Sequence, residues 1–332
     1  MRFRLLVLSI VGLGLVIGVT FPGCSPAFAE ELPWLVPGWL QNHVGEGEDQ
    51  IAQVVLQRAR ILYLNKTDEG AVHNPCYLAM DATRPGGLGN RFYVICEASR
   101  MFRALPAGHG SGLNLTGIAD FSNGIRCAKN FSDAKESELT TGGPYVTAEI
   151  RTSFKGYYRA SGELVPLMRS FVQFDGEGGA LTARPRGIGG HPGVIVSATC
   201  RMKAPGNPYA DNDGYVPFGK LIDYRTRRSN GCTSWLSADS QWILPLVENK
   251  PTTLYIYPES TDIVAVARAV EAGESPTRKG LYWNASCLTE IGLPNFWPRE
   301  TLEPVLMKYR KDYPLPRQPL PICSEQYVRL GD

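Results

Sequence analysis

The spacing of apolar residues along the chain changes from a helical to a strand-like pattern. Between residues 49 and 60, Ile51, Val54, Val55 and Ala59 recur at intervals that place them on one face of a helix. From residue 76 onward the apolar residues instead gather in short runs separated by glycine and proline. Such runs predict β-strands.

The predicted strands are rich in β-branched and aromatic residues and lie at 76–80, 91–96, 99–105, 145–150, 170–174, 193–196 and 254–257. The short polar link at 97–98 predicts a hairpin between the second and the third of them. Many short strands in a chain with 35 glycines and 25 prolines are typical of a β-sandwich or a barrel-like body. We therefore expect a mainly β fold.

Helical patterns return near the end of the chain, at residues 237–247 and 262–272, where Gly273 provides a C-terminal stop. A tail rich in proline and aromatic residues follows. We expect a lead-in segment with a helix at 30–55, a body at 56–260, and a helical or irregular C-terminal extension at 261–332 that packs on the core.

The first residues have the features of a signal peptide. Arg2 and Arg4 precede an apolar stretch, and Ala27-Phe28-Ala29 is a small-x-small cleavage site, so we expect residues 1–29 to be removed. This leader predicts export to the periplasm or cell envelope, and the later sequence contains no stretch that predicts a membrane span. A net charge of +2 gives no support to nucleic-acid binding.

The number of cysteines points to one reactive thiol. Of the eight cysteines, Cys24 lies in the leader, which leaves an odd number in the expected mature chain. Exported proteins tend to pair their cysteines, so the unpaired one is a candidate for chemistry. Cys232 has the most reactive-looking surroundings. The other six can form three disulfides in any of 15 ways, and they are Cys76, Cys96, Cys127, Cys200, Cys287 and Cys323.

The segment before Cys232 suits a nucleophile. Gly231 permits a sharp turn and close approach of a substrate. Arg227 and Arg228 lie just upstream, and neighbouring cations lower the pKa of a thiol. The N–H groups of Gly231 and Cys232 are candidates for an oxyanion hole.

A cysteine nucleophile needs a base, and the chain has four histidines. His43 and His73 precede the strands in loop-like contexts and are expected on the surface. His109 and His191 each lie among glycines, a setting found both in binding loops and in plain turns. Residues alone therefore leave a functional and a structural role open for His191.

At this point the chain resembles the L,D-transpeptidases of bacterial cell walls, the YkuD-like family, in which a histidine precedes a Ser-x-Gly-Cys motif. Here Ser229-Asn230-Gly231-Cys232 is similar to that motif, with His191 upstream. The strand at 92–95, the His109-Gly110 loop and the Arg184-Pro185-Arg186 stretch also resemble the family. The resemblance covers roughly residues 56–260 and looks closest to a divergent exported branch.

The resemblance implies a β-sandwich-like catalytic domain that acts on peptidoglycan stem peptides without a metal or a cofactor. Cys232 would attack the L-centre carbonyl of the third residue of a stem tetrapeptide, with His191 as general base and Ser229 and Gly231 in the catalytic motif. The terminal D-amino acid would leave, and an amine or water would resolve the acyl-enzyme. Substrate contacts are expected at Arg228, Arg227, Asn230, Arg186 and His109.

The resemblance also requires an insertion between His191 and Cys232, and residues 200–224 have the composition of a loop that could act as a lid. Asn230 stands where family members usually have a histidine. This substitution leaves open a catalytically silent cell-wall binding module as an alternative, beside a peptidoglycan L,D-peptidase. A zinc peptidase using His109 and His191 is disfavoured, because no HxxH, HExxH or CxxC spacing occurs.

Overall fold

The computed structural model describes residues 36–86, 89–224, 228–314 and 319–324. The predicted signal peptide at 1–29 lies outside these residues. None of the helices in the described ranges has both the length and the apolar character needed to cross a bilayer.

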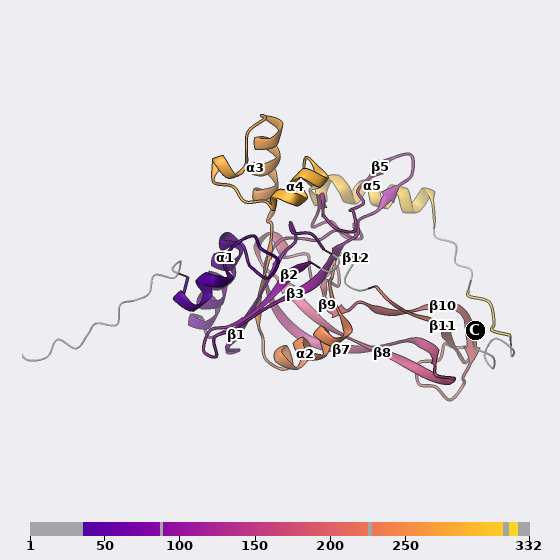
Figure 1. Cartoon of the computed structure of the whole chain (residues 1–332). Helices are drawn as coiled ribbons and strands as arrows, with labels where there is room; N and C mark the ends of the chain where they lie inside the picture. The colour runs from indigo at the N-terminus through magenta and orange to yellow at the C-terminus, as the bar shows by residue number, and fades with distance from the viewer. Residues whose placement is uncertain (1–35, 87–88, 225–227, 315–318, 325–332) are drawn as a thin grey trace, which may run out of the picture. The chain divides into compact units, whose positions relative to one another are not determined.

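The core of the molecule is a closed, mixed β-barrel of eight strands (Figure 1). In order around the barrel these are β7 (Gly143–Ala160), β14 (Thr253–Tyr257), β1 (Cys76–Asp81), β2 (Asn90–Cys96), β3 (Met101–Gly110), β13 (Thr233–Trp235), β9 (Gly189–Pro192) and β8 (Glu163–Gly176). Two neighbouring pairs, β1–β14 and β13–β9, are parallel, and the other pairs are antiparallel.

The expected β-sandwich is therefore wrong. Strands β7 and β8 pair with each other along most of their length, so the two ends of the sheet meet and no second packed sheet is needed. Strands of a sandwich and of a barrel alternate inward and outward residues in the same way. The sequence pattern consequently predicted strands without deciding how the sheet closes.

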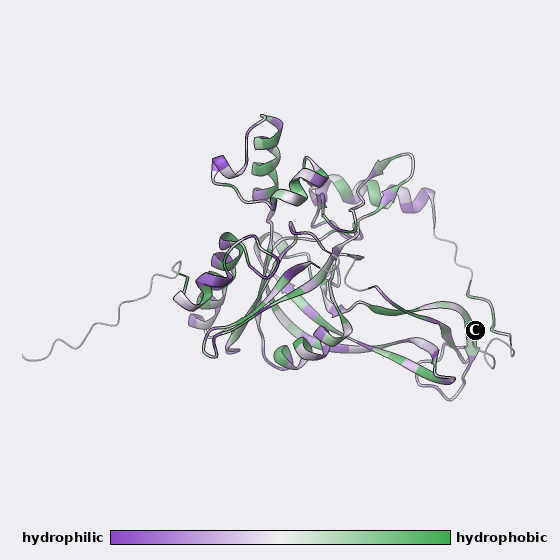
Figure 2. Ribbon diagram, in the orientation of Figure 1, coloured by the Kyte–Doolittle hydropathy of each residue, from purple (hydrophilic) through white to green (hydrophobic). Residues whose placement is uncertain are grey.

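The barrel strands β1, β2 and β14 are buried on both faces. Their inward residues, such as Leu78 and Val94, join Trp235 in the main core. Their outward residues, such as Tyr77 and Tyr93, pack with a helix, α1 (Gln53–Asp68), in a second cluster. Burial on both faces explains why these strands read as nearly continuous apolar runs. In Figure 2 the barrel strands show green stretches interrupted by paler and purple ones.

The expected loop at 200–224 is largely a β-hairpin. It consists of β10 (Val194–Lys203) and β11 (Tyr215–Asp223), and β11 adds to the sheet beside β7 through Phe218 and Gly219. Turn residues such as Asn207 and Gly214 occupy only the connection between the strands. Their composition dominated the prediction, although the flanking residues alternate and pair.

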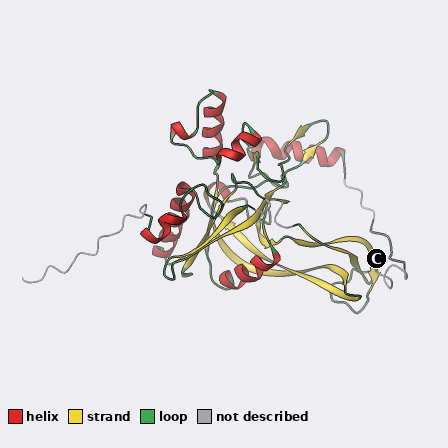
Figure 3. Cartoon of the chain, in the orientation of Figure 1, coloured by secondary structure: helices red, strands yellow, loops and turns green. Residues whose placement is uncertain are grey.

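Four helices follow in the C-terminal half of the chain (Figure 3), at α2 (Ser237–Val247), α3 (Ser260–Glu271), α4 (Ala285–Ile291) and α5 (Arg299–Asp312). Short strands and 3-10 turns complete the described residues, at η1 (Gly38–His43), β4 (Asn114–Leu115), β5 (Ala119–Asp120), β6 (Asn130–Phe131), η2 (Gly178–Ala180), β12 (Arg228–Ser229), η3 (Thr277–Lys279) and β15 (Asn295–Phe296).

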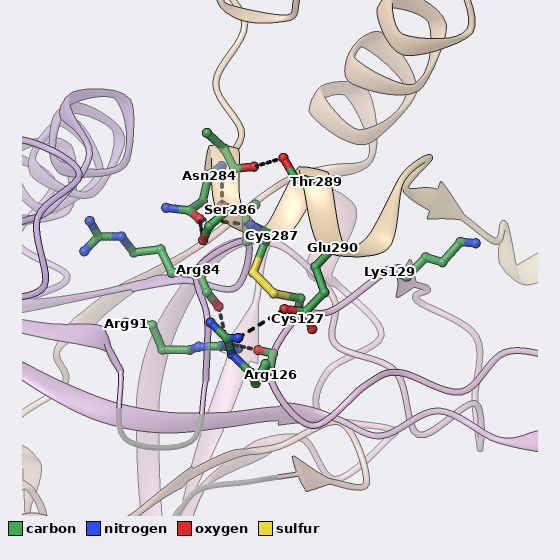
Figure 4. Close-up of a disulfide and its surroundings, with 12 residues drawn as sticks. Arg84, Arg91, Arg126, Cys127, Lys129, Asn284, Ser286, Cys287, Thr289 and Glu290 are labelled. Atoms are coloured by element: carbon green, nitrogen blue, oxygen red, sulfur yellow. Dashed lines mark hydrogen bonds and ion pairs between the residues drawn. A yellow bond between two sulfur atoms is a disulfide. The ribbon is translucent and has the colours of Figure 1, made fainter.

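Three disulfides link Cys76 to Cys96, Cys127 to Cys287 and Cys200 to Cys323. The second joins α4 to the segment after β5, beside Arg91, whose Nη2 donates to the carbonyl oxygen of Arg126 at 2.6 Å (Figure 4). The third joins β10 to residue 323. Two of the three therefore tie the region after residue 261 to earlier parts of the chain.

Candidate functional site

The candidate site lies on the outer face of the barrel, where β13 runs parallel to β9. The register pairs Thr233 with Gly190 and Ser234 with His191. Trp235 is completely buried in the main core, and a Cβ on Gly190 would meet its ring, so both face the interior. Because strand residues alternate, His191, Ser234 and Cys232 share the opposite face.

Cys232 is the free cysteine of the described residues. It is half-buried, and its Sγ donates to the carbonyl oxygen of Gly187 at 3.6 Å. Burial raises the pKa of this thiol above its ordinary value, while the Gly189 N–H and the charges of Arg169 and Arg186 act in the opposite direction. The expected lowering of the pKa is therefore wrong in sign, because desolvation outweighs the cations.

His191 is arranged as a neutral base. Its Nδ1 lies 2.9 Å from the carbonyl oxygen of Pro192, which can only accept, so Nδ1 carries the proton and Nε2 keeps its lone pair. Burial, together with the charges of Arg169 and Lys155, lowers the pKa of His191 to about 4. The ring is thus unprotonated at neutral pH.

His191 and Cys232 are diagonal neighbours across the two strands, because His191 is opposite Ser234. Diagonal neighbours in a sheet are within reach of long side chains. Among the described hydrogen bonds there is none between the His191 ring and Sγ of Cys232. Contacts of this kind are commonly loose in an unliganded enzyme and tighten with substrate.

The turn before Cys232 is built by the predicted motif. Ser229 pairs with Gly110 through β12, and its hydroxyl donates to the carbonyl oxygen of Cys232. Gly231 has a φ of +97°, which favours glycine, and a Cβ there would lie 2.9 Å from Cδ1 of Ile188. Ser229 and Gly231 thus shape the turn that presents Cys232, whereas the side chain of Asn230 is exposed. The oxyanion hole stays a prediction.

Arg186 is held by other parts of the protein. Its Nη2 donates to the carbonyl oxygen of Leu139 at 2.7 Å, and its Nη1 donates to that of Ser132 at 3.1 Å and to Thr141 Oγ1. With these donors engaged, Arg186 contributes positive charge near Cys232 more readily than a grip on a substrate carboxylate. Arg227 and the side chain of Arg228 lie outside the described residues.

His109 does not share the face of Cys232. Its side chain is completely buried, and its Nδ1 accepts a hydrogen bond from Nη1 of Arg91 at 2.8 Å. Arginine only donates, so His109 carries its proton on Nε2. This burial leaves His109 no surface for the predicted substrate contact, and a structural role in the barrel follows.

Sequence reasoning missed Arg169 and Phe171 on β8 and Lys155 on β7. The ring of Phe171 stacks on His191 with a centroid distance of 6.3 Å, and Arg169 lies two residues away on the same face. The predicted strand at 170–174 begins one residue after Arg169 and so leaves it out. Extending its alternation upstream would have placed Arg169 with Phe171, but nothing in the sequence places either beside Cys232.

Cys232 and His191 are thus brought to one face, and His109 is not. Comparison of the chain with protein-family models gives no match, and comparison with curated proteins gives no match either.

Proposed function

We propose that this protein is an exported, cysteine-dependent L,D-transpeptidase that acts on peptidoglycan stem peptides in the periplasm or cell envelope. The observation that carries the proposal is an unbonded cysteine just before β13 that shares one face of the sheet with a neutral histidine of β9. The resemblance of the Ser229–Cys232 motif to the YkuD-like family supplies the substrate class.

The proposed reaction begins with the neutral thiol. Nε2 of His191 takes the proton as Sγ of Cys232 attacks the L-centre carbonyl carbon of the third stem residue. The carbonyl π electrons move to oxygen, where the N–H groups of Gly231 and Cys232 are the candidate donors. Collapse of this intermediate breaks the C–N bond, and His191 passes its proton to the departing amino group of the terminal D-amino acid.

A thioester on Cys232 remains. An amine of a second stem peptide, or of a protein, attacks this thioester and gives up its proton to His191. The C–S bond breaks, and the sulfur recovers that proton. Water in place of the amine gives hydrolysis, so the same site supports an L,D-peptidase reaction.

The decisive experiment incubates the chain from residue 30 onward with a stem tetrapeptide and measures both the released D-amino acid and the intact mass. We expect stoichiometric release and a mass increase that Cys232→Ala abolishes, with His73→Ala, an exposed histidine, as control. A carbapenem should likewise acylate the wild type and leave Cys232→Ala unmodified.

Two outcomes decide against the proposal. Unchanged D-amino acid release by Cys232→Ala would assign the chemistry to another residue. A folded wild-type protein that binds peptidoglycan but is acylated by neither reagent would instead indicate the silent binding module.

A further inference from the structure

Two cations on the face of Cys232 have no acidic partner among the described residues. None of the salt bridges formed among the described residues involves Arg169 or Lys155. Nε of Arg169 is buried and has no hydrogen-bond partner within the described part of the chain. Both side chains are half-buried, so the positive charges are partly removed from water without compensation.

The strand register places Arg169 near the cysteine and the histidine, and charge interactions place Lys155 near Arg169 and His191. Ser153 of β7 is opposite Arg169 of β8, and Lys155 lies at the β-bulge that begins after Phe154. Lys155 is close enough for the charge of Arg169 to lower its pKa, and for its own charge to lower the pKa of His191. Phe171 lies two residues from Arg169 on β8, and its ring stacks on that of His191. The side chains of Lys155, Arg169, His191 and Cys232 therefore lie near one another, on β7, β8 and β9 and just before β13.

The electrostatic effects agree with this placement. Burial lowers the pKa of Arg169 and of Lys155, and the charge of Arg169 adds to the lowering for Lys155. A thiolate at Cys232 would act on the pKa of Arg169 in the opposite direction. Because Cys232 is a neutral thiol at rest, neither cation has a negative partner within the described residues until an anion binds.

We propose that Arg169 and Lys155 form a subsite for a carboxylate of the acyl donor, next to the carbonyl that Cys232 attacks. This inference rests on the proposed function for the identity of the donor. A carboxylate would supply the missing partner for both cations, and Arg169 offers it a planar pair of donors. The charged group would also orient the donor against Sγ.

The test compares the alkylation of Cys232 by iodoacetate with its alkylation by iodoacetamide. Both reagents react with the same thiolate, so their rate ratio cancels any change in the pKa of Cys232, and only the carboxylate senses the subsite. We expect Arg169→Gln and Lys155→Gln to lower this ratio by about tenfold and about threefold, since close charge pairs at a half-buried site are worth that order of attraction. The preference for iodoacetate should also weaken with added salt.

Arg159→Gln is the matched control. Arg159 lies on the same hairpin but at its far end, opposite Leu164, and donates to the carbonyl oxygen of Gly162. The Arg159→Gln variant removes the same charge and should leave the ratio of the iodoacetate rate to the iodoacetamide rate unchanged. Circular dichroism and thermal unfolding of each variant verify that it is folded.

Donor peptides then identify the carboxylate. One tetrapeptide carries a C-terminal amide, and a second carries a neutral side chain at position three. Loss of acylation rate for one of them in the wild type, with no further loss in Arg169→Gln, assigns that carboxylate to the subsite.

The subsite and the proposed function fail separately. A ratio that Arg169→Gln and Lys155→Gln both leave unchanged overturns the subsite, whether or not the enzyme cleaves stem peptides. A lowered ratio in a protein that no stem peptide acylates keeps the anion subsite and overturns the proposed donor.

Discussion

At the scale of single residues, burial sets the protonation of the candidate pair. It raises the pKa of Cys232 and lowers the pKa of His191 to about 4, so both groups are neutral at pH 7. This arrangement differs from a resting thiolate–imidazolium pair. The proton must move when the substrate is attacked, which makes His191 a base within the reaction and not before it.

Replacement of this base is the first prediction. His191→Ala should slow acylation of Cys232 by a stem peptide by about 100-fold, the usual scale for loss of a general base. Stopped-flow or quenched mass spectrometry measures the rate. His73→Ala should react like the wild type, and equal rates for the two variants would show that His191 is not the base.

The second prediction concerns pH. His191 binds a proton only as pH falls through about 4, so acylation should stay high down to about pH 5 and fall below it, and not near the ordinary value of about 6.5. Alkylation of the resting thiol by iodoacetamide should still be rising with pH beyond the ordinary thiol range of about 8.5, because the pKa of Cys232 is raised. An acidic limb near pH 6.5 would contradict the described environment of His191.

At the scale of elements, the site depends on the turn before Cys232 and on three neighbouring strands, β13, β9 and β8. β12 and β13 both pair with β3, and the residues between them form the turn that presents Cys232. β9 supplies His191, and β8 supplies Phe171 and Arg169. Strands hold such groups more firmly than loops, so small changes at the turn should move Cys232 relative to a fixed histidine.

Gly231→Ala tests this arrangement. The added Cβ would lie 2.9 Å from Cδ1 of Ile188 and 3.0 Å from the carbonyl oxygen of Leu139, on a backbone with φ of +97°. We expect acylation to fall sharply and the free energy of unfolding to fall by about 2 kcal/mol. Urea unfolding and the acylation rate are the measurements.

Gly280→Ala separates backbone strain from displacement of the turn. Gly280 has a φ of +70° but nothing within 4 Å of an added Cβ. It should therefore lose some stability and keep full acylation. Equal acylation in both variants would show that the turn at Gly231 tolerates the Cβ.

At the scale of the whole molecule, disulfides connect distant parts of the chain to the barrel. Cys127 and Cys287 are separated by 160 residues, and Cys200 and Cys323 by 123, whereas Cys76 and Cys96 are separated by only 20. In the chain-entropy account, a cross-link that closes a longer loop restricts the unfolded chain more.

The double variant Cys127→Ser/Cys287→Ser should therefore lower the free energy of unfolding by about 5 kcal/mol, against about 3 kcal/mol for Cys76→Ser/Cys96→Ser. Urea unfolding of the oxidised proteins measures both. Alkylation of the wild type by iodoacetamide without reductant, followed by peptide mapping, should modify Cys232 alone in the chain from residue 30 onward. Label at any other cysteine would contradict the pairing.

The sequence by itself determined the local features, because these depend on neighbours along the chain. The period of apolar residues placed α2 at its observed bounds of Ser237–Val247 and most of the barrel strands, although β7 and β8 extend well beyond the runs at 145–150 and 170–174. Most residues in the extended parts of β7 and β8 are half-buried or exposed, so a run of apolar residues does not indicate the strand there. The odd number of cysteines and the residues around Cys232 predicted which thiol stays free, and among the described residues this is confirmed.

Only the tertiary structure decided the contacts between distant residues. Closure of the barrel depends on the pairing of β7 with β8, which an alternating pattern cannot distinguish from a sandwich. The pairing of Cys76 with Cys96, the burial of His109 and the position of Arg169 likewise follow from how the strands pair, and the other two disulfides follow from how distant segments pack. The sign of the pKa shift at Cys232 depends on how deeply the folded chain buries the sulfur, and a list of neighbouring cations carries no information about depth.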